Sequence, residues 1–446
     1  MNNFKTSRFN ICFSKSTENK YYIYNTLTTA LLQIDGLLFS SLEKGNIPEL
    51  CADSFELLKP KGFIVSNNSN EAEEYLYYYN HTRFCESAGL LKLVIIPTYH
   101  CNLACAYCLQ GKGEQTAAPS QTIKTMKIGD AEKIITFMQS RISYNTSEVP
   151  LRKISITFHG GEPLSAFKIC KYIAENASRL ASQYSLPLVF SMSSNLTLLS
   201  PDIISFIKKY DVNVQVTIDG NEAQHNARRH FSNKEGTYAL IVRNLAALTD
   251  QGLKKNVVIR INLDSETVKN ADEIIDGVRK YSDDIYFGYL HIFKGKNESY
   301  SSKCLNDSCY SVNEAKLAEI YKRYRLPIPA SFGKKGPCSM NCENKFYIDP
   351  GLEIYKCELL INHPQYKTGY LNDNAKLINL PQYFRQMSWS PALFKKCLDC
   401  ILLPCCAGGC PALGKDYYDE DILNAHCQFS IEELTKHLEN YVAWRD

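Results

Sequence analysis

Three closely spaced cysteines, Cys101, Cys105 and Cys108, constrain this chain more than any other feature. Their spacing is C-x3-C-x2-C, and an apolar run at 91–96 leads straight into them. Three thiolates can hold three irons of a [4Fe–4S] cluster and leave the fourth iron without a protein ligand. A metal with an open coordination position performs chemistry, whereas a fully ligated metal is structural or carries electrons. The motif therefore predicts a reactive iron–sulfur centre at the end of a strand.

The composition is that of a globular protein and argues against several other classes. The chain has 446 residues, of which 45% are hydrophobic and 22% charged, and this length predicts two or three domains. A net charge of +3 is too small to indicate a nucleic-acid partner. No apolar run reaches the roughly 18–20 residues that span a bilayer, and residues 1–20 lack the apolar core of a signal peptide. We therefore expect a cytoplasmic protein with no membrane and no nucleic-acid partner.

Cysteine usage also indicates metal binding. The sequence holds 18 cysteines, and without an export signal this number points to metal ligands rather than disulfides. Eight of them lie in ligand-like groups between Cys338 and Cys427. Four scattered cysteines are expected to be buried thiols, namely Cys12, Cys51, Cys85 and Cys170. The roles of Cys304 and Cys309 are open.

Strand and helix patterns alternate along residues 89–300. Apolar, β-branched runs separated by helical stretches occur at 91–97, 154–158, 187–192, 212–218, 257–263 and 285–292. Six such units predict a parallel sheet, and they are too few to close an eight-stranded barrel. The predicted fold class is therefore α/β, a partial (β/α)6 barrel with its functional residues at the carboxyl ends of the strands.

The two flanking regions have different patterns. Residues 1–88 predict a small α+β module, with strands at 8–13 and 20–24, a helix over 26–42, a further short helix and a strand at 62–65. Residues 301–446 predict a loop-rich domain with short helices at 312–324 and 431–443. Because such a region buries little apolar surface, metal clusters are expected to hold it together.

A second motif, His159-Gly160-Gly161-Glu162-Pro163, ends the second predicted strand. The glycines would let the backbone approach a ligand closely, and Glu162 offers a carboxylate to an amine. An ordinary strand-to-helix turn is the alternative. Together with the cysteine motif, which has Tyr107 before its last cysteine, this segment resembles the radical S-adenosylmethionine (SAM) superfamily. The resemblance implies that the open iron binds the amino and carboxylate groups of SAM, and that an electron passed to the sulfonium releases a 5′-deoxyadenosyl radical.

Two more strand ends resemble segments of that family. Ser193-Ser194-Asn195 follows the third predicted strand, and Thr217-Ile218-Asp219-Gly220 follows the fourth. An arginine such as Arg260 could pair with the SAM carboxylate, although polar residues at strand ends also serve as helix caps. The resemblance implies SAM contacts from Tyr107, Gly160, Gly161, Glu162, Ser194, Asn195, Thr217, Arg229 and Arg260.

The C-terminal cysteines form a third set. Four of them follow the pattern C-x2-C-x5-C-x3-C from Cys397 to Cys410. With the others they provide eight thiolates, enough for two fully ligated [4Fe–4S] clusters, although a pair of zinc sites is the alternative because C-x2-C also binds zinc. The run resembles the SPASM extension of radical SAM peptide-modifying enzymes. The resemblance implies a first auxiliary cluster on Cys338, Cys342, Cys357 and Cys410, and a second on Cys397, Cys400, Cys406 and Cys427.

The same resemblance implies a function. It predicts three [4Fe–4S] clusters, SAM, an electron donor of the reducing flavodoxin or ferredoxin type, and a ribosomally made precursor peptide as substrate. The expected product is a cross-link, most often a thioether, with carbon–carbon and carbon–oxygen bonds as further options. Residues 1–88 resemble a winged-helix-like leader-peptide recognition element, which adds a leader strand to a sheet edge. A packing cap on the barrel is the alternative for this module.

Two other functions stay open. An anaerobic sulfatase-maturating enzyme oxidises Cys or Ser to formylglycine, and this group places an aspartate base directly after the third auxiliary ligand, where the present chain has Glu358. Glu358 and His225 are the candidate acid–base residues. A multi-cluster electron carrier is the alternative from another class, and it would need neither Glu162 nor an open iron.

Overall fold

A ten-stranded, mostly parallel sheet forms the centre of the molecule. The computed structural model describes residues 3–15, 20–45, 51–108, 124–145, 150–289, 317, 319–326, 333–361, 363–412, 424–427 and 430–445. The strand order of the large sheet is β11-β10-β9-β8-β7-β6-β12-β13-β14-β15. Its six consecutive parallel strands are β6 (Leu90–Ile95), β7 (Lys153–Phe158), β8 (Leu188–Ser194), β9 (Asn213–Thr217), β10 (Val257–Leu263) and β11 (Asp284–Tyr289). The predicted α/β alternation is confirmed.

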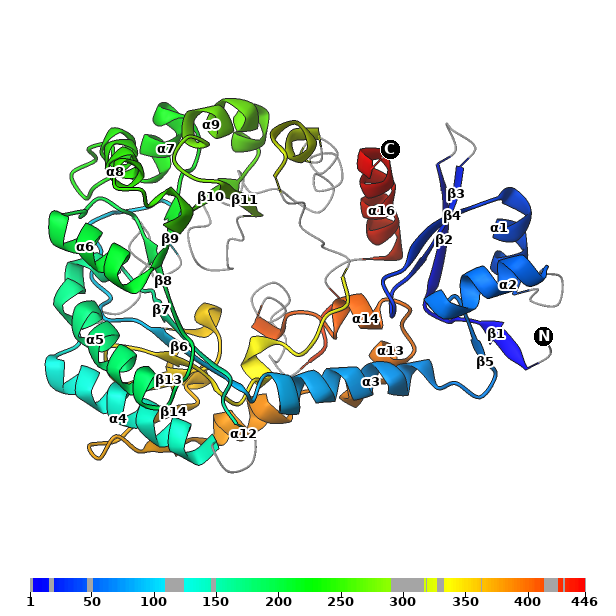
Figure 1. Ribbon diagram of the computed structural model, residues 1–446, viewed down its shortest axis with the longest axis horizontal. Coiled ribbons are helices and arrows are strands. Elements are labelled where there is room, and N and C mark those ends of the chain that lie inside the picture. Colours follow the sequence, from blue (N-terminus) through cyan, green and yellow to red (C-terminus); the bar gives the residue numbers. More distant parts are fainter. Residues whose placement is uncertain are drawn as a thin grey trace.

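Helices cover one face of this sheet, and the other face is polar. Figure 1 shows α4 to α9 in an arc on the outer side of the strands. Strand residues that point toward these helices are apolar and fully buried, such as Ile156 and Val216. The alternate residues, such as Thr157, Gln215 and Arg260, are polar and half-buried. Parallel sheets usually pack apolar side chains on both faces, so a polar face is one that can meet a ligand. The covering helices are α4 (Ile128–Asn145), α5 (Phe167–Gln183), α6 (Pro201–Tyr210), α7 (Glu222–Arg228), α8 (Tyr238–Asp250) and α9 (Ala271–Val278).

The C-terminal region extends the same sheet. Strand β12 (Lys345–Ile348) pairs in parallel with β6, with Ile348 opposite Ile95. Strands β13 (Glu353–Tyr355), β14 (Gly369–Leu371) and β15 (Leu377–Asn379) continue it in antiparallel fashion. Backbone pairing with the parallel sheet therefore holds this region, in addition to any metal.

The helices of the C-terminal region are mostly short. They are α12 (Pro381–Ser388), α13 (Lys395–Leu398), α14 (Leu403–Cys406) and α16 (Ile431–Arg445). The helix predicted at 431–443 is confirmed as α16. The helix predicted at 312–324 is confirmed at 317 and 319–324, whereas 312–316, 318, Cys304 and Cys309 lie outside the described residues.

The N-terminal region contains a small antiparallel sheet in the order β2-β3-β4, formed by Asn10–Lys15, Lys20–Asn25 and Leu31–Ile34. The strands expected at 8–13 and 20–24 are thus confirmed. The helix predicted over 26–42 is wrong in its first half, because Leu31–Ile34 pairs with β3. The helix α1 (Gly36–Glu43) begins only after Asp35, whose carboxylate accepts a hydrogen bond from the Leu38 amide at 2.8 Å. Pairing with a neighbouring strand outweighed the helical spacing of the leucines.

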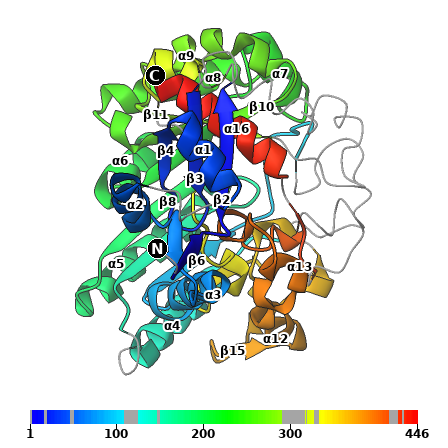
Figure 2. The same ribbon diagram turned by 90° about the vertical axis from the view of Figure 1, so that its right-hand side faces the viewer.

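Both faces of this small sheet are covered. Helices α1 and α2 (Ala52–Leu58) enclose a core around Ile23 and Phe63, beside the pair of β1 (Phe4–Thr6) and β5 (Ile64–Ser66). The C-terminal helix α16 packs on the sheet's other face, where Leu438 shares a core with Tyr24. Figures 1 and 2 show this meeting of the first and last segments of the chain, with α3 (Glu71–His81) leading from the N-terminal region toward β6. Among the described residues, no helix has both the length and the apolar character needed to cross a membrane.

Candidate active site

The segment that carries Cys101, Cys105 and Cys108, which we call the cysteine loop, follows β6. Backbone hydrogen bonds connect it to the end of α7 and the segment that follows. The Ala104 amide donates to the His230 carbonyl (2.8 Å), and the Ala106 amide donates to the Arg228 carbonyl (2.9 Å). These bonds fix the backbone between the cysteines, so the positions of the thiols are set by the fold of the protein itself.

The three thiols of this loop act on one another electrostatically. Burial raises the pKa of Cys105 to about 12; Arg229 opposes the rise, and Cys108 and Cys101 add to it. Among the described residues, no three His, Cys, Asp or Glu side chains are grouped as they stand so that they could hold a metal ion. Three half-buried thiols in one loop, with a guanidinium beside them, match the donor set of an anionic iron–sulfur cluster.

The two glycines of the second motif make room for the cysteine loop. A Cβ at Gly161 would lie 2.2 Å from the carbonyl oxygen of His100, and Gly160 has a φ of +131°. The Gly161 amide donates to the Thr98 carbonyl (3.1 Å) and the Glu162 amide to the His100 carbonyl (2.8 Å). The glycines were predicted to let the backbone approach a ligand, and the segment that approaches them closely in the structure is 98–100, directly before Cys101.

Glu162 joins the ends of β7 and β8. Its carboxylate accepts hydrogen bonds from the Leu164 amide (3.0 Å), the Ser194 hydroxyl (2.8 Å) and the Asn195 amide (2.7 Å). Burial raises the pKa of Glu162, and these three hydrogen bonds oppose the rise. The Asn195 side chain in turn lies 3.8 Å from the Cys101 sulfur. Glu162, Ser194 and Asn195, predicted from separate motifs, are therefore brought together beside the cysteine loop.

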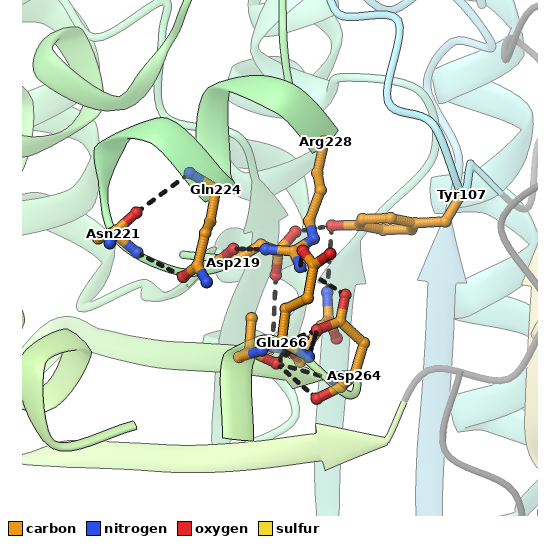
Figure 3. Close-up of polar contacts among 9 residues, drawn as sticks. Tyr107, Asp219, Asn221, Gln224, Arg228, Asp264 and Glu266 are labelled. Atoms are coloured by element: carbon orange, nitrogen blue, oxygen red, sulfur yellow. Dashed lines mark hydrogen bonds and ion pairs between the residues drawn. The ribbon is translucent and has the colours of Figure 1, made fainter. Parts of the chain in front are cut away.

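A second polar network links the same loop to β9 and β10 (Figure 3). The Tyr107 hydroxyl donates to the buried carboxylate of Asp219. That hydroxyl accepts hydrogen bonds from Arg229 (2.9 Å) and from the Asn262 side chain (3.2 Å). Burial raises the pKa of Asp219, and Arg229 opposes this rise. Asp219 and Asn262 were not among the predicted site residues; the signal for Asp219 was its position directly after a strand.

Thr217 and Arg260 lie side by side on the polar face. Arg260 stands opposite Thr217 of β9 and Tyr286 of β11 in the strand register. Its Nε donates to the Asn262 side chain at 2.8 Å, which connects it to the Tyr107 network. A guanidinium in this position can bind a carboxylate.

His225 is buried, and both of its ring nitrogens have protein partners. Its Nδ1 accepts a hydrogen bond from the Asp219 amide (3.2 Å), and its Nε2 pairs with the Thr237 hydroxyl (3.1 Å). Burial lowers the pKa of His225 well below the usual range, and Arg229 and Arg228 add to this effect. The position argues against the predicted acid–base role and favours positioning of the loop that carries Asp219.

Glu358 is exposed and follows Cys357 at the start of a short 3-10 turn. It acts electrostatically on His159, whose Nδ1 is buried without a hydrogen-bond partner among the described residues. Burial lowers the pKa of His159, Glu358 opposes this shift, and Arg260 adds to it. His159 was not predicted, although it directly precedes the two glycines. An acid–base role for Glu358 stays a prediction.

Electrostatic effects link several of the C-terminal thiols. Burial raises the pKa of Cys357, and Cys338 and Cys410 add to the rise. Burial also raises the pKa of Cys338, and Cys410 and Cys342 add to that rise. Cys410 therefore acts on the upstream cysteines, although it is close in sequence to Cys406. The ligand sets that the family resemblance implies stay a prediction.

A second set of electrostatic effects acts on Cys397. Burial raises the pKa of Cys397 to about 11, with Cys406, Cys427 and Cys400 adding to the rise. Cys405, the neighbour of Cys406, instead lies fully buried in the core between the N-terminal sheet and α16. Cys406 and Cys400 also act electrostatically on Cys405, so Cys406 as the ligand stays a prediction that rests on the x5 spacing.

The scattered cysteines follow the prediction only in part. Cys170 is buried, as expected, and Cys12 is half-buried. Cys51 and Cys85 are exposed, so their prediction as buried thiols is wrong. Cys51 caps α2 by accepting a hydrogen bond from the Ser54 amide at 3.4 Å, and a cap lies at the surface.

The parallel α/β sheet has a three-thiol loop after its first strand and a buried carboxylate after its second. Residues 95–278 match the model of the radical SAM superfamily. A cysteine-type anaerobic sulfatase-maturating enzyme of Clostridium novyi is 23% identical over 72% of this chain and 87% of its own length. The radical SAM cyclopropyl synthase TigE of Paramaledivibacter caminithermalis is 21% identical over 90% of this chain and 89% of its own length. The solved structure of native anSMEcpe with bound AdoMet superposes with a TM-score of 0.61 at 18% identity, covering 79% of this chain and 97% of that one, which establishes the common fold.

Proposed function

We propose that this chain cleaves SAM reductively and oxidises a ribosomally made precursor peptide, forming a thioether or another cross-link. The observation that carries the proposal is the place of the three motif cysteines in the loop after β6, where the Asn195 side chain lies 3.8 Å from the Cys101 sulfur and the Asn195 backbone amide donates to the buried Glu162 carboxylate. A group of three leaves a metal position open for a reactant, whereas groups of four complete the ligation.

Each thiol group has a proposed role. Cys101, Cys105 and Cys108 would hold the reactive [4Fe–4S] cluster, and the two four-thiol groups would hold the auxiliary clusters. When bound, the reactive cluster supplies the electron that cleaves SAM and so provides an oxidant for a C–H bond. A reducing flavodoxin or ferredoxin would donate that electron. Because a multi-cluster electron carrier would not need a three-thiol site beside Glu162, the enzyme is favoured over the carrier.

The polar strand ends would position SAM. Glu162 presents a buried carboxylate suited to the SAM amino group, held in place by Ser194 and Asn195. Arg260 and Arg229 present guanidinium groups suited to the SAM carboxylate. Gly160 and Gly161 allow the cysteine loop to pack closely beside Glu162. Tyr107 from this loop and Thr217 from β9 would complete the lining of the SAM site.

The N-terminal region supports a peptide substrate. We assign residues 1–88 to a leader-binding module, 89–300 to a partial (β/α)6 barrel and 301–446 to the auxiliary-cluster domain. The edge strand β4 pairs on one side with β3, and an extended peptide can add to a strand of this kind. The cyclopropyl synthase aligns over 90% of the chain, whereas the sulfatase-maturating enzymes align over 70–76%. A relative that aligns over a larger share of the chain favours the cross-linking reaction, and its name, a cyclopropyl synthase, keeps a carbon–carbon bond among the candidate products.

Formylglycine formation is the second candidate. The fold of anSMEcpe, solved in complex with the Cp18Cys peptide, and the place of Glu358 after Cys357 favour it. A carboxylate there would take a proton from the substrate residue. The longer glutamate side chain changes the reach of this base, so the cross-linking reaction stays our first choice.

One assay separates the candidates. The anaerobically reconstituted protein is mixed with SAM and dithionite in two parallel reactions. One reaction receives a Cys-bearing precursor encoded beside its gene, and the other receives a leaderless sulfatase-type Cys peptide. We expect 5′-deoxyadenosine to rise only with the precursor, together with a peptide mass lower by two hydrogens. An aldehyde on the leaderless peptide, trapped by a hydrazide, would instead identify formylglycine formation, and no 5′-deoxyadenosine with either peptide would contradict both enzyme proposals.

A Cys101→Ala/Cys105→Ala/Cys108→Ala variant provides the metal control. Iron should fall from about twelve to about eight atoms per chain. Turnover that survived this change would exclude the proposed reactive cluster.

A further inference from the structure

Three lysines lie on the polar face of the large sheet, near the amino-terminal ends of β6, β7 and β12. Lys92 of β6 and Lys345 of β12 are partners in the strand register. Ser155 of β7 is the register partner of Lys92 on its other side. Lys153 precedes Ser155 by two residues on β7 and therefore shares its face. We call Lys92, Lys153 and Lys345 the lysine row.

The alternation of side chains along the strands places the lysine row opposite the helices. Leu91 and Phe346, which neighbour Lys92 and Lys345 in sequence, are buried in the core that the helices cover. The two lysines therefore point to the other face. Lys92 is exposed, and Lys345 is half-buried with its Nζ 5.1 Å from the ring centre of Tyr347. Lys92 thus presents its charge on the face of the sheet that can meet a ligand.

The charge of the lysine row is not balanced within the part of the chain that the structure describes. None of its three ammonium groups forms an ion pair there. Burial and Lys92 lower the pKa of Lys345, and Glu358 opposes this shift without forming an ion pair. Like charges that face each other on neighbouring strands repel. A bound anion would relieve this repulsion and favour the charged form of both lysines.

We propose that the lysine row binds an acidic side chain of the peptide substrate. The proposal rests on the proposed function, which supplies the peptide. A carboxylate accepts hydrogen bonds from ammonium and hydroxyl groups, and those are the groups of the lysine row and Ser155. Farther along the same face, the half-buried hydroxyl residues Thr157 and Ser191 are register partners. Their small side chains suit an extended peptide backbone that runs from the lysine row toward the cysteine loop.

Strand geometry predicts where the acidic residue lies in the substrate. Lys92 stands three residues before Ile95, where β6 ends and the chain continues to the cysteine loop. Three residues of strand span about 10 Å, and an extended peptide covers that length with the same number of residues. Because SAM would lie beyond the strand end, we expect the carboxylate about three to six residues from the residue that reacts.

The test measures binding separately from turnover. The probe is the fluorescently labelled Cys-bearing precursor, whose modified residue is known from the mass assay above. Anisotropy is recorded with the anaerobically reconstituted protein and SAM, without dithionite, so that no reaction occurs. In an amide precursor, each acidic residue three to six positions from the modified residue is changed to Asn or Gln. In a lysine precursor, the same residues are changed to Lys.

Three protein variants probe the lysine row: Lys92→Met, Lys345→Met and Lys92→Glu. Lys171→Met is the matched control, because Lys171 is exposed on α5, on the helix-covered side of the sheet (Figure 1). The parent protein should bind the amide precursor at least about fivefold more weakly than the unchanged one. Lys92→Met and Lys345→Met should lose a similar factor with the unchanged precursor and nothing further with the amide precursor. Lys92→Glu should bind the lysine precursor better than the unchanged one, and Lys171→Met should match the parent.

Other results would overturn the inference. Equal affinities of the parent protein for the unchanged and amide precursors would do so, and this comparison depends on no protein variant. Equal weakening of both precursors by Lys92→Met would assign Lys92 to the stability of the sheet. A precursor that is modified but has no acidic residue in the stated interval would also contradict the lysine row. In these cases binding and turnover persist, whereas a parent protein that neither binds nor modifies the precursor would contradict the proposed function itself.

Discussion

Tyr107 donates a buried hydrogen bond to Asp219 and so fixes the last turn of the cysteine loop to the end of β9. Arg229 and Asn262 donate to the same hydroxyl, at 2.9 Å and 3.2 Å. One side chain of the loop therefore binds residues that follow or belong to two different strands. The proposed cluster site and the polar face of the sheet are held as one unit by this contact.

Replacing Tyr107 tests this connection. Tyr107→Phe leaves the buried Asp219 carboxylate without its hydroxyl donor, so the free energy of unfolding should fall by about 1–3 kcal/mol. SAM cleavage should fall with it. Urea denaturation of the metal-free protein and a 5′-deoxyadenosine assay measure the two effects. Tyr77→Phe, on a side chain that is 74% exposed, should change neither quantity. Equal stabilities for the two variants would contradict the structural role of the hydroxyl.

Gly161 should tolerate no side chain. The Cβ of Gly161→Ala would collide with the backbone of His100, which must move together with the neighbouring Cys101. We expect reconstituted iron to fall by about four atoms per chain and SAM cleavage to be lost. Gly129→Ala is the matched control, because a Cβ there meets nothing within 4 Å. Full iron in Gly161→Ala would show that the loop can shift without losing its cluster.

The buried guanidinium of Arg228 forms ion pairs with two carboxylates, those of Asp264 and Glu266. Its guanidinium lies 2.7 Å from Asp264 and 2.8 Å from Glu266, and Asp264 is fully buried (Figure 3). Arg228→Met would leave that carboxylate uncompensated and should cost about 3–5 kcal/mol in the free energy of unfolding. Arg179→Met removes an exposed pair with Glu175 and should cost about 0–1 kcal/mol. Similar losses in denaturant titrations of the two variants would argue against the burial effect.

The stability of the protein should depend on pH through His225. Burial lowers the pKa of this imidazole in the folded chain, whereas the unfolded chain binds the proton below about pH 6.5. The free energy of unfolding should therefore fall as the pH drops below about 6.5, by up to about 1.4 kcal/mol per pH unit, and this contribution should be constant above that pH. His159 contributes in the same direction. Urea titrations between pH 5 and 8 should show a smaller slope for His225→Gln than for the parent protein. An unchanged slope in His225→Gln would contradict a neutral buried His225.

Glu358 provides the test of the proposed base. Glu358→Gln should leave uncoupled SAM cleavage near the parent level and reduce peptide modification by about 100-fold or more, because only proton transfer from the peptide is affected. Liquid chromatography of 5′-deoxyadenosine and mass spectrometry of the peptide report the two steps separately. Equal losses in both steps would instead assign Glu358 to the architecture of the site.

Patterns that are local in sequence were predicted well. The strands β6 to β11 follow from apolar runs of strand length, and the cysteine loop from its spacing, because both depend on neighbours a few residues apart. The helix predicted over 26–42 failed at Leu31–Ile34, where a partner strand decided the conformation. The burial of His225 and the partners of both its ring nitrogens were also outside the reach of the local pattern, because they come from Asp219 and Thr237.

The sequence by itself determined which residues can bind metal and which strand ends carry polar groups, since spacing and residue chemistry are written along the chain. Only the tertiary structure decided that β12 pairs with β6 and that Asp219 accepts the hydrogen bond of Tyr107. These contacts join residues far apart in sequence. They depend on which surfaces the whole chain can bury together, and no local pattern contains that information.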